Sequence, residues 1–156
     1  MDINNLRNIA IIAHVDHGKT TLVDRLLQQS GTLDRKNMDS ERIMDSNEQE
    51  KERGITITAK NTSINWNDHL INIVDTPGHA DFAQEVCKSL HACEGVVLLV
   101  DATQGVQAQT LAHVHVAKRN NLVIVPVVNK IDLIADPEDT RLKQLRGDLR
   151  KLCGDD

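Results

Sequence analysis

The chain has 156 residues, enough for a single domain with a substantial hydrophobic core. Hydrophobic residues make up 40% of it and charged residues 26%, as in soluble globular proteins, and no apolar run approaches the length of a membrane span. The formal net charge of −5 argues against a protein that mainly coats nucleic acid, because that role needs a basic face. Docking on a ribonucleoprotein through a local patch stays open.

The composition also indicates where the protein works. The first residues lack the basic start of a secretion signal. The three cysteines are an odd number at no metal-like spacing, which indicates reduced thiols rather than disulfides or a metal site. We expect a cytoplasmic monomer that neither enters a membrane nor recognises nucleic acid by direct sequence readout.

The first strong motif follows a buried strand predicted at residues 8–13. The stretch A-H-V-D-H-G-K-T-T occupies residues 13–21, and a helix is predicted from there to about Gln29. Strand, tight loop and helix start are the context of a phosphate-binding loop, whose backbone N–H groups surround a polyphosphate. Ala13 stands where the usual pattern has glycine. The candidate nucleotide-binding residues of this loop are His14, Val15, Asp16, His17, Gly18, Lys19, Thr20 and Thr21.

Two residues of the loop carry specific chemistry. We expect Lys19 to reach the β- and γ-phosphates and the hydroxyl of Thr20 to bind Mg²⁺. Lys19 is therefore a candidate catalytic residue as well as a nucleotide ligand. Gly31 is predicted to end the helix that follows.

Residues 31–56 differ in character from the rest of the chain. Twelve of these 26 residues are charged, and few are large and apolar. Such a segment buries too little surface to order itself, so it predicts a mobile loop with at most short helical turns. Thr56, near its end in R-G-I-T-I, can contribute an Mg²⁺ ligand once a γ-phosphate is present, which would make the segment an order–disorder switch. A passive surface insertion is the alternative.

Two further strands are predicted at residues 57–66 and 69–74, joined by a hairpin turn at Asn67-Asp68. The first alternates polar and apolar residues, as an edge strand does. The second ends at Asp75 within D-T-P-G-H, and an acid at the end of an apolar strand is suited to hold Mg²⁺. Gly78 is a candidate for close approach of a backbone N–H to the γ-phosphate.

The second half of the chain alternates helices and strands. Helices are predicted at residues 80–93 and 106–119, and buried strands at 95–101 and 122–128. Asp101 ends one of these strands, and we expect it to play a structural, hydrogen-bonding role. A last helix is predicted to begin at Pro137, with leucines on one face and a solvated basic face opposite.

This alternation predicts an α/β fold of the P-loop NTPase type. Its sheet is expected to be doubly wound and mostly parallel, with one antiparallel edge strand. Ligands bind at the carboxyl ends of the strands in such sheets, and every motif described above falls at such an end.

The tetrapeptide N-K-I-D at residues 129–132 indicates which base is bound. As a carboxylate, Asp132 can accept hydrogen bonds from N1–H and N2–H₂ of guanine, whereas adenine offers no such pair of donors. Asn129 and Lys130 are expected to support the base and the loop below it. The expected cofactors are therefore GTP or GDP with Mg²⁺, and an ATP-using enzyme is disfavoured.

Together, the motifs A-H-V-D-H-G-K-T-T-L, R-G-I-T-I, D-T-P-G-H-A-D-F and N-K-I-D resemble those of the translational GTPase family, over almost the whole chain. Residues 6–82 are most similar to the TypA/BipA ribosome-associated GTPases. From about Ser89 onward the chain is more similar to LepA, also called elongation factor 4. The subfamily stays open.

The resemblance implies a mechanism. In such proteins the ribosome triggers hydrolysis, and the histidine that matches His79 positions the attacking water. Val15 and Ile55 match the apolar gate in front of that histidine, and Thr20 and Thr56 match the two Mg²⁺-binding threonines. The candidate catalytic residues are Lys19, Gly78 and His79, and the candidate metal ligands are Thr20, Thr56 and Asp75.

The chain departs from the family pattern at its C-terminal end. We expect a G domain over residues 1–156 that lacks the last strand and helix and the loop that covers guanine, which would leave residues 122–128 as an open apolar sheet edge. The leading interpretation is a GTP-binding and GTP-hydrolysing domain of a translation factor. The alternative is a truncated module that binds guanine nucleotide or a protein partner without competent hydrolysis.

Overall fold

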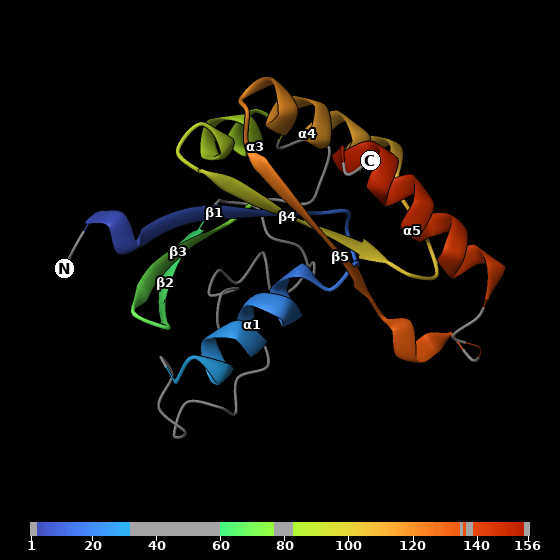
Figure 1. The fold of residues 1–156 in the computed structure, drawn as a ribbon, viewed down its shortest axis with the longest axis horizontal. Coiled ribbons are helices and arrows are strands. Elements are labelled where there is room, and N and C mark those ends of the chain that lie inside the picture. The colour runs from blue at the N-terminus through green and yellow to red at the C-terminus, as the bar shows by residue number, and fades with distance from the viewer. Residues whose placement is uncertain (1–2, 32–59, 77–82, 135, 137–138, 155–156) are drawn as a thin grey trace.

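The computed structural model describes residues 3–31, 60–76, 83–134, 136 and 139–154 (Figure 1). The predicted mobile segment 31–56 lies almost entirely outside these residues. The described elements, in chain order, are η1 (Ile3–Asn5), β1 (Leu6–Ala13), α1 (Lys19–Gln29), β2 (Lys60–Trp66), β3 (His69–Asp75), α3 (Ala83–Leu90), β4 (Gly95–Asp101), α4 (Ala108–Arg119), β5 (Val123–Asn129), η4 (Ile131–Leu133) and α5 (Thr140–Cys153).

The described strands form one sheet in the order β2-β3-β1-β4-β5. β1 pairs in parallel with both β3 and β4, and β4 pairs in parallel with β5. Only β2 runs antiparallel, as the partner of β3 at one edge. The predicted fold class is thus confirmed. Because the other strands are parallel, their carboxyl ends meet at one edge of the sheet, where the motifs lie.

The hairpin between β2 and β3 forms where its turn residues predict it. Asn67 and Asp68 have φ angles of 47° and 64°, the left-handed pair that a two-residue type I′ turn requires. Asn and Asp tolerate this conformation better than most residues do. The register then places Ile64 opposite Ile71, and the side chain of Ile64 is buried.

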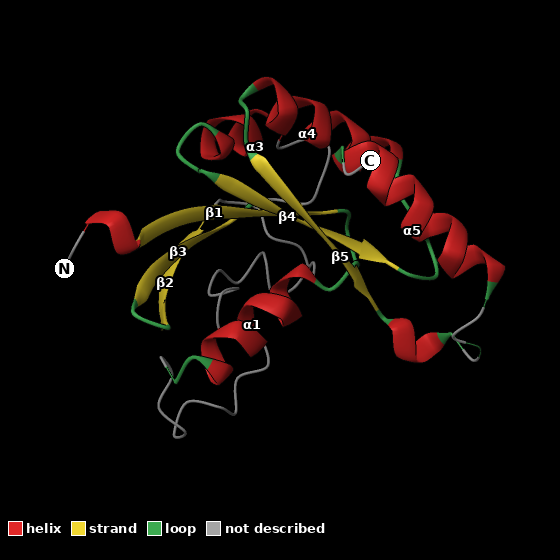
Figure 2. Cartoon of the chain, viewed as in Figure 1, coloured by secondary structure: helices red, strands yellow, loops and turns green. Residues whose placement is uncertain are grey.

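Helices cover both faces of the sheet (Figure 2). α1 packs on one face, where its residues Val23 and Leu27 meet Ile11 of β1 and Ile73 of β3. α3, α4 and α5 pack on the other face, around the apolar run of β4. The doubly wound arrangement follows from these strands: β1 and β4 are apolar on both sides, and both sides must be covered.

β5 is the open edge of the sheet in the described part of the chain. The N–H of Val123 donates to Glu94 and the C=O of Asn129 accepts from Ala102, so the odd-numbered residues of β5 bond to the β4 side. Pro126 therefore lies at an outward position, where its missing N–H costs no ladder hydrogen bond. Val123 and Val125 are 67% and 51% exposed in the described structure.

Three helix boundaries differ from the prediction. α3 ends at Leu90 rather than at residue 93, and the predicted residues 80–82 lie outside the described part of the chain. The last helix begins at Thr140 rather than at Pro137, because the carboxylate of Asp139 accepts the Arg141 N–H at 2.8 Å and caps the helix there. The helix before β5 begins at Ala108 rather than near residue 106. Gly31 follows α1 with a φ of 69°, as predicted for its C-terminal end. No described helix is long and apolar enough to cross a membrane, and none of the three cysteines forms a disulfide in the described structure.

Candidate nucleotide-binding site

The phosphate loop lies between β1 and α1, at the carboxyl edge of the sheet. β1 is buried over its last residues, and the chain then turns through Asp16, which has a φ of 63°, to Gly18, which has a φ of 92°. α1 begins directly afterwards at Lys19, so its N-terminal N–H groups face the loop. This combination favours a bound anion.

Gly18 fits its position for two independent reasons. Its φ lies in the left-handed region, which glycine adopts without steric cost. A Cβ placed there would also collide with the side-chain nitrogen of Asn129. The loop and Asn129, the last residue of β5, therefore lie so close together that a side chain at position 18 would displace the Asn129 amide.

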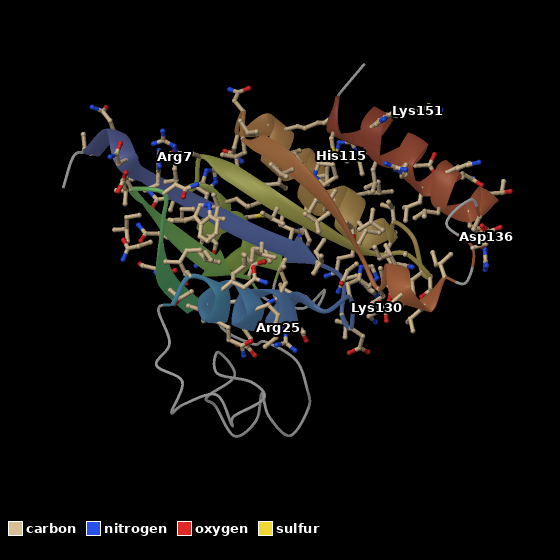
Figure 3. All side chains as sticks on the ribbon, turned by 60° about the horizontal axis from the view of Figure 1, so that its bottom comes forward. Arg7, Arg25, His115, Lys130, Asp136 and Lys151 are labelled. Carbon is tan, nitrogen blue, oxygen red and sulfur yellow. The ribbon has the colours of Figure 1, made fainter. Side chains whose placement is uncertain are left out.

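Asn129 and Lys130 brace the loop through its backbone. The Asn129 amide Nδ2 donates to the C=O of His17 at 2.9 Å, and the Lys130 Nζ donates to the C=O of Asp16 at 2.6 Å. Lys130, labelled in Figure 3, follows β5 where the chain lies beside the loop between β1 and α1. These contacts agree with the expectation that both residues support the loop.

Asp101, the last residue of β4, is the second partner of Lys130. Its carboxylate lies 2.8 Å from the Lys130 Nζ and also accepts the N–H and the hydroxyl of Thr103 at 2.7 and 2.6 Å. Asp101 is 1% exposed. Burial acts to raise the pKa of this carboxyl, but the bonds from Lys130 and Thr103 outweigh it and hold the pKa far below its usual range. The predicted structural role of Asp101 is confirmed by these contacts.

The side chains of the loop differ in exposure. Asp16 is exposed, whereas His14 and Val15 are partly buried and their neighbour His17 is completely buried. His17 therefore faces the protein interior, and it can meet a nucleotide only through its backbone. In α1, Lys19 is 7% exposed, Thr20 is partly buried and Thr21 is exposed.

Asp132 lies in η4, two residues after Lys130, the second of the two residues that brace the loop. Its side chain is exposed, and Lys130, directly before η4, has a φ of 57° that turns the chain into this helix. The candidate base reader thus lies beside the phosphate loop although 112 residues separate Asn129 from His17. This arrangement suits a nucleotide whose base and phosphates are held together at one edge of the sheet.

The remaining candidates are only partly described. The backbone of Asp75 ends β3 opposite Ile11 of β1, at the same edge of the sheet. Its side chain is outside the description, and so are Thr56, Gly78 and His79. Within the described residues, no group of three or more His, Cys, Asp or Glu side chains could hold a metal ion.

Comparison with known proteins decides the family. The model of the elongation factor Tu GTP-binding domain matches residues 4–154, nearly the whole chain.

The chain belongs to this family.

Relatives within the family are close. An elongation factor 4 from Campylobacter curvus is 53% identical over 141 residues, covering 87% of this chain and 24% of the relative. The large ribosomal subunit assembly factor BipA from Salmonella typhimurium is 61% identical over 130 residues, covering 83% of this chain and 21% of the relative. The resemblance to both subfamilies is thus confirmed. The chain spans about a quarter of the length of these relatives.

Two solved structures share this G-domain fold. A crystal structure of a protein from Thermus thermophilus superposes with a TM-score of 0.82 at 30% identity, covering 95% of this chain and 22% of that one. The bacterial selenocysteine-specific elongation factor EF-Sec superposes with a TM-score of 0.73 at 28% identity, covering 93% and 23%. The chain therefore has the architecture of a translation-factor G domain.

Two features of this G domain were not anticipated from the sequence. The Thr76 hydroxyl donates to the C=O of Ile11 at 2.6 Å, which ties the chain after β3 to β1. In the sequence, the position of Thr76 directly after Asp75 is the one signal for this contact. The inward orientation of His17 carries no sequence signal at all, because histidine occurs at the surface and in the interior alike.

Proposed function

We propose that this G domain binds GTP and GDP with Mg²⁺ and hydrolyses GTP to GDP and phosphate. The observation that carries the proposal is the pair of contacts from Asn129 and Lys130 to the backbone of the phosphate loop. They join the residues next to the guanine reader to the phosphate loop, so that base and phosphates belong to one site. Family membership supports the same chemistry.

Each residue has a proposed role. Lys19 binds the β- and γ-phosphates, and the loop backbone around Gly18 holds them with N–H groups. Asp132 reads guanine. Thr20, Thr56 and Asp75 hold Mg²⁺, which neutralises charge on the phosphates when bound. Gly78 presents a backbone N–H to the γ-phosphate, and His79 positions the attacking water.

We further propose that the domain works on the ribosome as a cytoplasmic monomer that does not enter membranes. The names of relatives support this assignment, one being a large ribosomal subunit assembly factor and another an elongation factor. Residues 1–156 form the G domain in this proposal, and residues 31–56 act as its switch segment. Direct readout of nucleic-acid sequence is not part of it.

A second candidate is a guanine-nucleotide or protein-binding module without competent hydrolysis. The exposed side chains of Val123 and Val125 favour it, because they offer an apolar surface to a partner. Asp132 is also exposed in the described structure, so no described residue covers the base position.

A titration with fluorescent GDP and GTP separates these functions. We expect saturable binding, and we expect GTP binding to depend on Mg²⁺. Excess unlabelled GTP should abolish the signal, whereas the same excess of ATP should leave it unchanged. Ribosome-stimulated phosphate release then distinguishes the enzyme from the binding module. Displacement by ATP would contradict the assignment of Asp132, and failure of a folded chain to bind either nucleotide would contradict the proposed function.

Replacing His79 with alanine tests the hydrolytic step. We expect ribosome-stimulated hydrolysis to fall by about a hundredfold, because a positioned group that orients or deprotonates water contributes at least that much. GDP affinity should stay unchanged. His91→Ala, at an exposed position after α3, is the matched control and should behave as wild type. Equal hydrolysis by the His79→Ala and wild-type proteins would exclude the role.

A further inference from the structure

The imidazole of His17 occupies an unusual position below the phosphate loop. It is 0% exposed, and its Nδ1 lies 3.3 Å from the backbone N of Asp101 and 3.5 Å from the C=O of Leu99. One ring nitrogen cannot accept from the N–H and donate to the C=O at once. The contact with the Asp101 N–H is the shorter of the two, so we assign Nδ1 as its acceptor, which places the ring proton on Nε2.

The surroundings of His17 favour this neutral form. Burial lowers the pKa of His17, and the neighbouring ring of His14, at a centroid distance of 5.4 Å, acts in the same direction. The C=O of Leu99, the carboxylate of Asp101 and the side chain of Gln104 act in the opposite direction, but burial outweighs them and the pKa of His17 stays lowered. Lys130 neutralises that carboxylate through its ion pair. In a protonated ring Nδ1 would carry an N–H that points at the N–H of Asp101, and these two donors would repel each other.

His17 completes a set of contacts that hold the loop from two strands. From the β5 side, Asn129 and Lys130 hold the carbonyl groups of His17 and Asp16. From the β4 side, the backbone N–H of Asp101 holds the His17 side chain. The carboxylate of Asp101 also pairs with Lys130. Asp101 of β4 is therefore linked to the loop twice, directly through His17 and indirectly through Lys130.

We propose that His17 is a positioning residue whose imidazole fixes the phosphate loop against the end of β4, so that the loop backbone is arranged for the diphosphate before nucleotide binds. The inference rests on the proposed function and deepens it. Preorganisation of this kind raises the affinity for nucleotide, because the free-energy cost of ordering the loop is not subtracted from the binding free energy. The affected part of the ligand is the diphosphate rather than the base.

A histidine that merely fills the core would behave differently. His17 Nε2 has no hydrogen-bond partner among the described residues, and a buried donor without a partner lowers stability. Replacement by leucine removes that donor, but it also removes the acceptor of the Asp101 N–H, so stability alone does not separate the two roles. A purely structural His17 predicts that the folded variant keeps the wild-type nucleotide affinity, whereas a positioning His17 predicts that this affinity falls.

The substitutions His17→Leu and His17→Asn test this on the full chain. Leucine and asparagine have nearly the same shape, but asparagine keeps a polar acceptor close to the position of Nδ1. We expect His17→Leu to bind GDP about tenfold more weakly than wild type, from the loss of one buried hydrogen bond and looser loop geometry, and His17→Asn to restore most of the affinity. The ratio of GDP to GMP affinity should fall in His17→Leu, because GMP engages less of the loop.

His113 of α4 provides the matched control. It is also buried, with an unpaired Nε2, but no described hydrogen bond joins it to the loop. We expect His113→Leu and His113→Asn to share one GDP affinity and one GDP-to-GMP ratio. Equal affinities of His17→Leu, His17→Asn and wild type would overturn the inference while leaving the proposed function intact. Absence of GDP binding by the wild-type chain would overturn the proposed function, and this inference with it.

A spectroscopic measurement covers the case in which His17→Leu does not fold. The ¹⁵N chemical shifts of the His17 ring in the wild-type chain should report an unprotonated Nδ1 and a protonated Nε2 at neutral pH. This tautomer is the one that accepts from Asp101. A protonated Nδ1 that donates to Leu99 would overturn the inference.

Discussion

Replacing Asp132 with asparagine should lower the affinity for GDP by about 10³-fold. The carboxylate can accept two hydrogen bonds from the N1–H and N2–H₂ groups of guanine. The asparagine amide has only one acceptor oxygen, and its NH₂ donor would face one of these two guanine donors. Hydrogen bonds to a charged group contribute about 1.5–3 kcal/mol each, so the loss of both amounts to about 3–6 kcal/mol. Discrimination of this size is typical of sites whose polar groups are left unpaired by the wrong ligand.

The same substitution should create a new preference. Xanthine has a carbonyl in place of the 2-amino group of guanine, and that carbonyl can accept from the asparagine amide. Competition between xanthosine diphosphate and fluorescent GDP measures the change. Asp148→Asn, an exposed position on α5, is the matched control and should keep wild-type affinity. An Asp132→Asn protein with unchanged GDP affinity would show that this residue does not read the base.

Removing the charge of Asp101 should destabilise the domain by about 3 kcal/mol. The substitution Asp101→Asn keeps the shape of the side chain but leaves the Lys130 ammonium without its buried partner. Removal of one member of a buried ion pair costs about 3–5 kcal/mol, and the lower end applies because the Lys130 side chain is 31% exposed. Urea denaturation at neutral pH measures the change in the free energy of unfolding.

The effect should depend on pH in a defined direction. Because the folded pKa of Asp101 is depressed, its contribution to stability is complete above the unfolded pKa of about 4 and falls as the pH drops below that value. Wild-type and Asp101→Asn proteins should therefore approach each other in stability on acidification.

A double-mutant cycle with Lys130→Met isolates the pair. The two changes should be less damaging together than the sum of their separate effects, because each one alone leaves its partner unpaired. Strict additivity would show that the ion pair is not coupled. The same variants should weaken GDP binding, since Lys130 also holds the C=O of Asp16 in the phosphate loop.

Local chemistry accounts for the elements that were predicted correctly. Continuous Ile and Val runs become parallel strands because they have no polar side to expose, and β4 forms at the predicted residues. The Asn67-Asp68 turn is equally local. Where the local signals compete, as between Pro137 and Asp139 at the start of α5, the side-chain cap determines the boundary.

The amino-acid sequence by itself determined the fold class, the order of the strands along the chain and the positions of the phosphate loop and of N-K-I-D at the ends of strands. Hydrophobic periodicity and turn residues act over a few positions, so they can be read from the sequence. Only the tertiary structure decided that His17 is buried, that Asp101 serves both the loop and Lys130, and that Asn129 leaves no room for a side chain at position 18. These contacts join β1, β4 and β5 across long stretches of chain, and their distances and side-chain directions exist only once the strands have packed together.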